Sequence, residues 1–240
     1  MTELSSTPAP LDAVTLAKKA AAEYAVDHAV ESGMRIGLGT GSTAVWAVRR
    51  VGELLGDGRL RDVVAVPTSN ATADDARACG VPLTTLAEHP VLDVTVDGAD
   101  EVDPVLDCIK GGGGAHLREK LVAQASQRLV IVIDASKLVP VLGTAFPVPV
   151  EVVQMGRVPE TLYVQALGFD VSWRHRDGQP FVTDEGNWIL DVTTGPIEDK
   201  DALLDRLLRR AGVVEVGLFL GMASDVVVAR PDGTVEHLTH

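Results

Sequence analysis

The sequence contains few cysteines, few aromatic residues and few basic residues, and each shortage excludes a class of protein. Only Cys79 and Cys108 are cysteines among 240 residues, which argues against a disulfide framework and against a cysteine-based zinc site. Four phenylalanines, three tryptophans and two tyrosines are too few and too scattered for a surface that stacks nucleic-acid bases. No apolar run is long enough to cross a bilayer.

The charge balance is strongly acidic. The chain has 34 Asp and Glu against 21 Lys and Arg, a formal net charge of −13 at pH 7. The electrostatic field of this net negative charge repels nucleic-acid phosphates and anionic membrane surfaces, so we expect neither a nucleic acid nor a membrane as a partner. The first ten residues, MTELSSTPAP, lack the basic and apolar segments of a secretion signal. We interpret them as a disordered leader on a cytoplasmic protein with free thiols.

Short apolar segments alternate with helical patterns in the first part of the chain. Segments that are apolar throughout are typical of parallel strands buried on both faces. The patterns predict a doubly wound α/β domain over residues 11–145 and 220–240. The expected elements are a helix over 11–32, strands over 34–38, 63–66, 92–96 and 129–133, and a helix that ends at Val51.

The later part of the chain has a different order of elements. A strand, a helix, two strands, a helix and a strand follow one another, which is the β-α-β-β-α-β order of a ferredoxin-like fold. We therefore predict a small α+β domain over 146–219, inserted before a last strand and turn within 224–237 that return to the first sheet. The expected elements cover 148–154, 158–167, 170–175, 188–192, 201–210 and 213–219.

A glycine-rich loop, GTGST at residues 39–43, lies between a predicted strand and a predicted helix. Glycines let the backbone approach an anion, which the helix amides and the hydroxyl groups then bind. With Ala44 the loop fits a dinucleotide-binding pattern, but that pattern needs an acid about 20 residues later. Pro67, Thr68 and Ser69 occupy that place. A phosphate is favoured over a dinucleotide, with a tight turn and a Ser or Thr helix cap as the alternative.

Four carboxylates follow the strand over 92–96, namely Asp97, Asp100, Glu101 and Asp103. Their spacing does not match an EF-hand loop. Taken alone, the segment is most simply a solvated acidic turn, with a magnesium site as the alternative.

Four glycines, residues 111–114, separate Lys110 from a predicted helix. The lysine precedes the glycines, so this is not a Walker A loop. Successive amides ahead of a helix form a nest for developing negative charge. Glu119 lies in the first turns of that helix and, beside Lys110, is a candidate base. A flexible linker and a helix-stabilising charge are the alternatives.

These segments converge, because the carboxyl ends of parallel strands border one crevice. The six histidines, His116 included, show no zinc-ligand spacing. Lys137, beyond the strand over 129–133, is a weak signal alone. The combination predicts proton transfer next to a carbonyl of a small phosphorylated substrate, with an enediolate stabilised by hydrogen-bond donors rather than by a metal.

Three segments together resemble the type A ribose-5-phosphate isomerase family. They are GLGTGSTA at 37–44, DGADE at 97–101, and KGGGG at 110–114 with REK at 118–120. The segments SKLV at 136–139, PVPVEV at 147–152, DEGN at 184–187 and GVVE at 212–215 are also similar. The resemblance therefore covers nearly the whole chain, and the order and spacing are specific although no single segment is.

The resemblance implies a Rossmann-like domain with a ferredoxin-like one, and interconversion of ribose 5-phosphate and ribulose 5-phosphate without metal or nucleotide cofactor. Glu119 would move a proton between C2 and C1, and Lys110 with the following amides would stabilise the enediolate. Asp97 and Asp100 would hold sugar hydroxyls, one of them assisting ring opening. A homodimer or homotetramer is also implied. The implied substrate-binding residues are Thr40, Gly41, Ser42, Thr43, Asp97, Gly98, Ala99, Asp100, Lys110, Gly111, Gly112, Gly113 and Lys137.

Two other functions fit part of the sequence. A domain that senses sugar phosphates would bind the ligand without converting it, and would have no use for Asp97, Asp100, Lys110 and Glu119 together. A nucleotide-dependent oxidoreductase is disfavoured by the missing acid after the second strand. The departures from the family, at His116, at Leu117 and in the leader, leave these roles in place.

Overall fold

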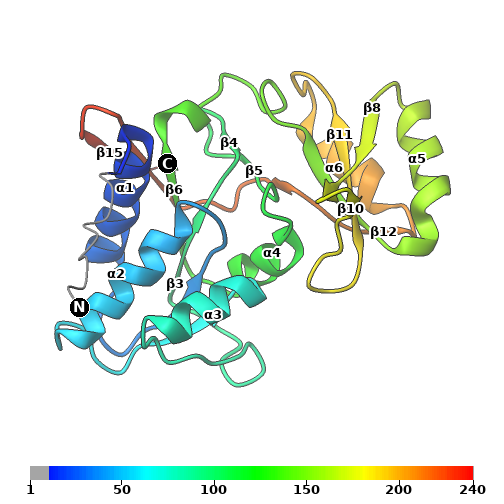
Figure 1. The fold of residues 1–240 in the computed structure, drawn as a ribbon. Helices are drawn as coiled ribbons and strands as arrows, with labels where there is room; N and C mark the ends of the chain where they lie inside the picture. Colours follow the sequence, from blue (N-terminus) through cyan, green and yellow to red (C-terminus); the bar gives the residue numbers. More distant parts are fainter. Residues whose placement is uncertain (1–10, 240) are drawn as a thin grey trace, which may run out of the picture.

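The computed structural model describes residues 11–239 (Figure 1). The predicted leader lies outside them. Five parallel strands and one antiparallel edge strand form the main sheet, in the order β15-β14-β6-β3-β1-β2. These strands are β1 (Arg35–Leu38), β2 (Val64–Pro67), β3 (Val94–Gly98), β6 (Leu129–Asp134), β14 (Asp225–Ala229) and β15 (Val235–Thr239).

The central strands are buried on both faces, as their apolar sequences predict. On β6, Val130 and Val132 pack in the core that α1 and α2 cover, whereas Ile131 and Ile133 pack in the core on the other face. Ala123 of α4 belongs to that second core. The helices of this part are α1 (Ala13–Ala29), α2 (Ala44–Gly56), α3 (Asn70–Ala78) and α4 (His116–Gln124).

An antiparallel four-stranded sheet, in the order β12-β7-β11-β8, lies with two helices at the right of Figure 1. Its chain order, strand-helix-strand-strand-helix-strand, is the predicted one, and with the doubly wound main sheet it confirms the α/β fold class. Its elements are β7 (Val148–Val152), α5 (Arg157–Ala166), β8 (Asp170–Trp173), β11 (Trp188–Thr193), α6 (Lys200–Leu208) and β12 (Val213–Val216).

The predicted single strand over 213–219 is wrong, because the chain breaks it at Gly217. A Cβ atom there would lie 2.2 Å from the carbonyl oxygen of Lys110. Only glycine therefore lets the two backbone segments lie this close together. Beyond it, β13 (Leu218–Phe219) joins a three-stranded sheet with β5 (Cys108–Ile109) and β4 (Glu101–Val102). The prediction also missed α3, this small sheet, and the hairpin of β9 (His175–Arg176) and β10 (Gln179–Pro180).

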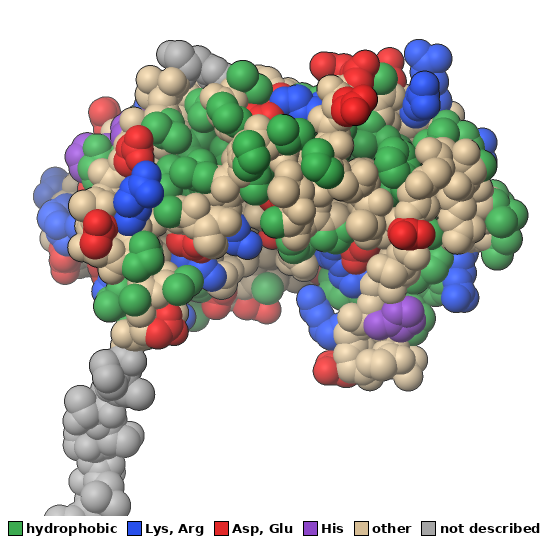
Figure 2. All heavy atoms as spheres, turned by 90° about the horizontal axis from the view of Figure 1, so that it is seen from above, with side chains coloured by type: hydrophobic (Ala, Val, Ile, Leu, Met, Phe, Trp, Pro, Cys, Tyr) green, Lys and Arg blue, Asp and Glu red, His purple; other side chains and the backbone are tan. Residues whose placement is uncertain are grey.

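The visible face of the molecule carries charges of both signs (Figure 2). Figure 2 shows acidic and basic side chains interspersed over the visible face, with no single basic surface. Within residues 11–239, no helix combines the length and the apolar character that crossing a membrane requires. Cys79 and Cys108 are both free thiols, as predicted.

Candidate active site

A cavity of about 250 Å³ opens at the carboxyl ends of β1 and β3. Every predicted site residue except Asp97 lines it, so residues far apart in the sequence meet at one place. Lys18 of α1 is an additional lining residue. The lining residues are Lys18, Thr40, Gly41, Ser42, Thr43, Gly98, Ala99, Asp100, Lys110, Gly111, Gly112, Gly113, Glu119 and Lys137.

Lys110 lies between two carboxylates at the base of this cavity. Its Nζ atom is 2.9 Å from Oδ2 of Asp97 and 3.2 Å from Oε2 of Glu119. It also donates a hydrogen bond to the carbonyl oxygen of Gly98. All three charged side chains are at most 4% exposed. Charges this deeply buried are costly unless they are paired, so the cluster is held by its own ion pairs.

The pKa values of all three groups differ from their ordinary values. It raises the pKa of Glu119 to about 8, although the Lys110 ammonium opposes the rise. Burial raises the pKa of Asp97 as well, again against Lys110. Burial alone would lower the pKa of Lys110, but the Asp97 and Glu119 carboxylates raise it above its ordinary value. A carboxyl group that ionises near neutral pH beside a fixed cation is suited to general base catalysis.

The two aspartates of the DGAD segment have different surroundings. Asp97 lies beneath the cavity wall, where its Oδ1 atom accepts hydrogen bonds from the backbone N–H groups of Gly98 and Thr40, at 2.7 and 3.1 Å. Asp100 lines the cavity itself, and its carboxylate accepts a hydrogen bond from the Gly112 N–H at 2.7 Å. Asp100 is therefore the aspartate placed to contact a ligand directly.

The remaining carboxylates of this segment face away from the cavity, so the simple picture of a solvated acidic turn is wrong. Glu101 is 1% exposed and accepts hydrogen bonds from the backbone N–H groups of Gly143, Ala145 and Phe146. Asp103 is 6% exposed and pairs with Lys200. Because the four side chains bind different partners, they do not converge on a common point.

The glycine loop between Lys110 and α4 has a shape that needs glycine. Gly111 has a φ of +110°, and a Cβ atom there would lie 2.8 Å from Nδ1 of His116. The loop is fixed rather than a linker, because the Gly114 N–H binds the Gly111 carbonyl oxygen. His116 itself is fully buried and does not line the cavity, and burial lowers its pKa to about 3.

The GTGST loop contributes hydroxyl groups in two directions. Thr40 Oγ1 points into a cluster with Thr68, Ser69 and Thr72, at 2.8–3.0 Å. Ser42 Oγ accepts a hydrogen bond from Lys18 Nζ at 3.0 Å. The helix-cap alternative fails at Thr43, which precedes α2 without a side-chain capping bond.

Lys18 is the site residue that the sequence prediction missed. It lies 24 residues before Ser42, and no motif distinguishes it from the adjacent Lys19. Only the rotation of α1 against α2 places Lys18 at the cavity, while Lys19 pairs with Glu23 at 3.6 Å. The helical periodicity of α1 could have indicated which of the two lysines faces the carboxyl end of β1. It could not have shown that the Lys18 side chain reaches the GTGST loop.

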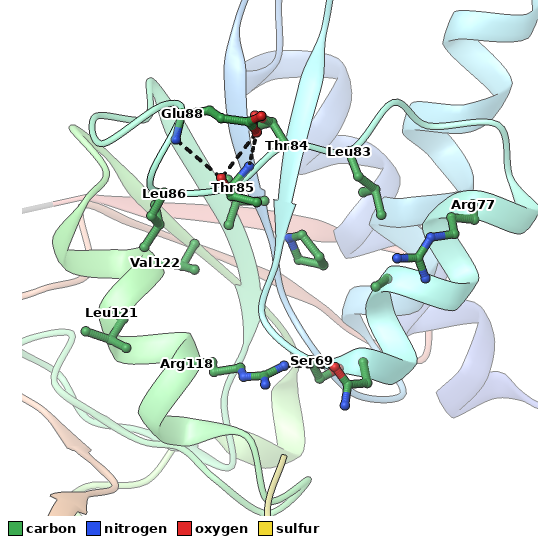
Figure 3. Close-up of a pocket in the computed structure, with 14 residues that line it drawn as sticks. Ser69, Arg77, Leu83, Thr84, Thr85, Leu86, Glu88, Arg118, Leu121 and Val122 are labelled. Carbon is green, nitrogen blue, oxygen red and sulfur yellow. Dashed lines mark hydrogen bonds between the residues drawn. The ribbon is translucent and has the colours of Figure 1, made fainter. Parts of the chain in front are cut away.

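A larger cavity, of about 450 Å³, lies between α3 and α4 and includes none of the predicted residues. Figure 3 shows Ser69 and Arg118 at one end and Thr84, Thr85 and Glu88 at the other. Its polar groups bind one another: the Glu88 carboxylate accepts from both threonines, and Arg118 donates to the side-chain oxygen of Asn70 at 3.0 Å. It holds no buried titratable cluster, so the smaller cavity is the candidate active site.

Comparison with known proteins identifies the family of the chain. The family model described as ribose 5-phosphate isomerase A (phosphoriboisomerase A) matches residues 64–233. The ribose-5-phosphate isomerase A of Chloroflexus aurantiacus is 54% identical over 226 residues, with 94% of each chain covered. The chain belongs to the ribose 5-phosphate isomerase A family. The relative from Desulfatibacillum aliphaticivorans is 50% identical over 220 residues, covering 91% of this chain and 95% of its own.

Solved structures of the family share the fold. Ribose 5-phosphate isomerase from Plasmodium falciparum aligns with a TM-score of 0.92 at 42% identity, over 94% of this chain and 99% of its own. A D-ribose-5-phosphate isomerase solved in complex with phospho-erythronic acid aligns with a TM-score of 0.91 at 35% identity, over 95% of this chain and 99% of its own. The family named from the sequence resemblance is confirmed.

Proposed function

We propose that the chain interconverts ribose 5-phosphate and ribulose 5-phosphate by proton transfer through an enediolate. The observation that carries the proposal is the Lys110 ammonium, held between Asp97 and Glu119 at a cavity lined by backbone amides. Family membership supplies the substrate pair. The residues supply a base and a cation within one hydrogen-bond length of each other, as this reaction requires.

The reaction balances with one carboxylate as the base. Glu119 takes the proton from C2 of the open-chain aldose, and the electron pair forms the C1–C2 double bond as O1 becomes an oxyanion. The Lys110 ammonium and the loop amides stabilise that charge. The O2 proton moves to O1, and Glu119 returns its proton to C1, which leaves a C2 carbonyl and a C1 hydroxymethyl group.

The two aspartates would support this chemistry in different ways. Asp100 lines the cavity, so we assign it the sugar hydroxyls and assistance in ring opening. Asp97 lies beneath Lys110 and would act by holding the ammonium in place. Removing the Asp97 charge would take away one of the two carboxylates that pair with Lys110, and removing the Asp100 charge would take away a proposed partner of the substrate in a buried site.

A phosphate would bind at the part of the cavity that Lys18, Lys137, Ser42 and Thr43 line, which we call its phosphate end. Lys18 Nζ donates a hydrogen bond to Ser42 Oγ there at 3.0 Å. Lysine ammonium groups and hydroxyl donors bind phosphate oxygens as charge-assisted hydrogen bonds. The cluster at Lys110 and the phosphate end of the cavity together suit a small sugar phosphate as the substrate.

Two structural expectations remain predictions. We propose a homodimer or homotetramer, as the family resemblance implies. We also propose the division into a Rossmann-like domain, residues 11–145 and 220–240, and a ferredoxin-like lid over 146–219.

The test is isomerisation of ribose 5-phosphate in D₂O with EDTA present. We expect ketose to form and solvent deuterium to accumulate at C1 of ribulose 5-phosphate over many turnovers, because Glu119 exchanges its proton with water. Ketose without deuterium would indicate a hydride shift and overturn the enediolate. Binding of ribose 5-phosphate without turnover would make the chain a sugar-phosphate sensor.

A further inference from the structure

We propose that Arg174, held by Asp191, is a positioning residue that orients the amides of the glycine loop toward the reacting atoms of the substrate. This inference rests on the proposed function, because it concerns stabilisation of the enediolate. Neither residue lines the cavity, so neither is expected to touch the substrate.

Arg174 binds the back of the glycine loop. Its Nη1 atom donates to the carbonyl oxygens of Gly111 and Gly112, at 2.5 and 3.1 Å. Arg174 follows β8 in the four-stranded sheet, whereas the loop precedes α4 beside the main sheet. One guanidinium group therefore connects the two parts of the molecule at the loop that borders the candidate active site.

Asp191 fixes the guanidinium in that position. Arg174 Nε donates to Asp191 Oδ2 at 2.9 Å, and Nη2 donates to the other carboxylate oxygen. Both side chains are about one-seventh exposed, at 14% and 15%. A bidentate pair of this kind sets the plane of the guanidinium as well as its distance, and lysine cannot reproduce it.

Binding the carbonyl oxygens determines where the amides point. A trans peptide is planar, so the N–H of Gly112 points away from the carbonyl oxygen of Gly111, and the N–H of Gly113 away from that of Gly112. The Gly112 N–H binds Asp100, which lines the cavity. No residue in the 11–239 range accepts a hydrogen bond from the Gly113 N–H. With Arg174 on the carbonyl side, both amides point to the cavity side of the loop.

The charge of Arg174 adds to this geometric effect. A cation on a peptide oxygen polarises the peptide and strengthens its N–H as a donor. The effect is greatest when the acceptor is an anion, as in the enediolate, and small when it is a neutral hydroxyl. Arg174 should thus stabilise the transition state more than the bound substrate.

The experiment compares Arg174→Lys with wild type in kcat, KM and the binding of two inhibitors. Phospho-erythronic acid carries a carboxylate where the enediolate would be, and ribitol 5-phosphate carries only neutral hydroxyls there. We expect kcat to fall about tenfold or more, with KM for ribose 5-phosphate within about threefold. Kd for phospho-erythronic acid should rise in parallel with the loss of kcat, and Kd for ribitol 5-phosphate should not change.

A second variant and a matched control separate positioning from folding. Asp191→Asn should lower kcat in the same way, and the double variant should lose no more than Arg174→Lys alone, since the residues act as a unit. Arg210→Lys is the control, because Arg210 pairs with the buried Glu160 at 2.8 Å and makes no contact with the glycine loop. The Arg210→Lys variant should keep the wild-type kcat and the wild-type Kd for both inhibitors.

Two outcomes would overturn the inference. One is a kcat for Arg174→Lys and Asp191→Asn equal to that of wild type. The other is equal weakening of both inhibitors, which would indicate general damage to the cavity. If wild type itself does not form ketose, the proposed function fails instead, and the parallel wild-type assay distinguishes the two failures.

Discussion

The Nζ atom of Lys110 lies 3.2 Å from Oε2 of Glu119, and both side chains are almost fully buried. The Lys110 cation favours the charged form of the Glu119 carboxyl group, whereas burial favours its neutral form. This opposition is what brings the pKa of Glu119 to about 8. Three of the five predictions below concern Glu119 itself.

Glu119→Gln removes the base while keeping the shape of the side chain. We expect kcat to fall by about 10²–10⁴, the usual contribution of a general base. Binding of phospho-erythronic acid should persist, because Lys110 and the amides remain. Glu236→Gln, an exposed change on β15, serves as the control with wild-type kcat. Turnover of Glu119→Gln near the wild-type rate would exclude Glu119 as the base.

The activity should rise with pH. Only ionised Glu119 can accept the C2 proton, so kcat/KM should increase as the pH passes through about 8 and then level off, since Lys110 stays protonated there. The substrate phosphate ionises near pH 6 and is titrated separately. A profile that is already flat above pH 6 would contradict the raised pKa.

The same group should make the protein less stable at high pH. In the folded state Glu119 keeps its proton up to about pH 8, but in the unfolded chain it loses it near 4.5. Stability therefore falls as pH rises between these values, because the native state binds the extra proton. Glu119→Gln should raise Tm by about 2 °C or more at pH 9 and leave it unchanged at pH 4. An equal Tm difference at both pH values would refute this linkage.

Lys18 and Lys19 offer a matched pair of variants on one helix. Lys18→Met removes a cation from the phosphate end of the cavity, so KM for ribose 5-phosphate should rise about tenfold, the value of one charge-assisted hydrogen bond of roughly 1.4 kcal/mol. Lys19→Met, which loses only a surface pair with Glu23, should leave KM unchanged. Equal effects of the two variants would show that Lys18 acts only through the overall electrostatic potential of the protein and not by contact with the phosphate.

Removal of divalent metals should not affect the activity. Glu101 and Asp103 are bound to backbone amides and to Lys200, and Asp97 to Lys110, so the acidic segment offers no converging set of oxygens. Activity should therefore survive dialysis against EDTA. A loss that Mg²⁺ restores would show that the carboxylates rearrange around a metal.

Local sequence determined much of this protein. The apolar runs predicted the parallel strands, and the order of elements after residue 148 predicted the four-stranded sheet. The glycine loops and the residues beside them predicted the lining of the cavity, because strand ends in a parallel sheet meet at one edge. An apolar pattern does not define where a short strand ends. The break at Gly217 depends on a backbone contact with Lys110, more than 100 residues away.

Tertiary packing decided what the local pattern left ambiguous. Val14 and Leu16 of α1 are about half exposed, whereas Ala21, Ala22 and Ala25 are buried, because small side chains let the helix approach the sheet closely. That rotation of α1 also sends Lys18 rather than Lys19 to the cavity.

The burial of Glu119, its distance from Lys110, and the contact of Arg174 with the glycine loop likewise arise between distant segments. The sequence thus determined which chemical groups are present and which edge of the sheet they share. The folded structure alone decided how deeply they are buried and which charges pair, since desolvation and ion pairing depend on neighbours that are remote in the chain.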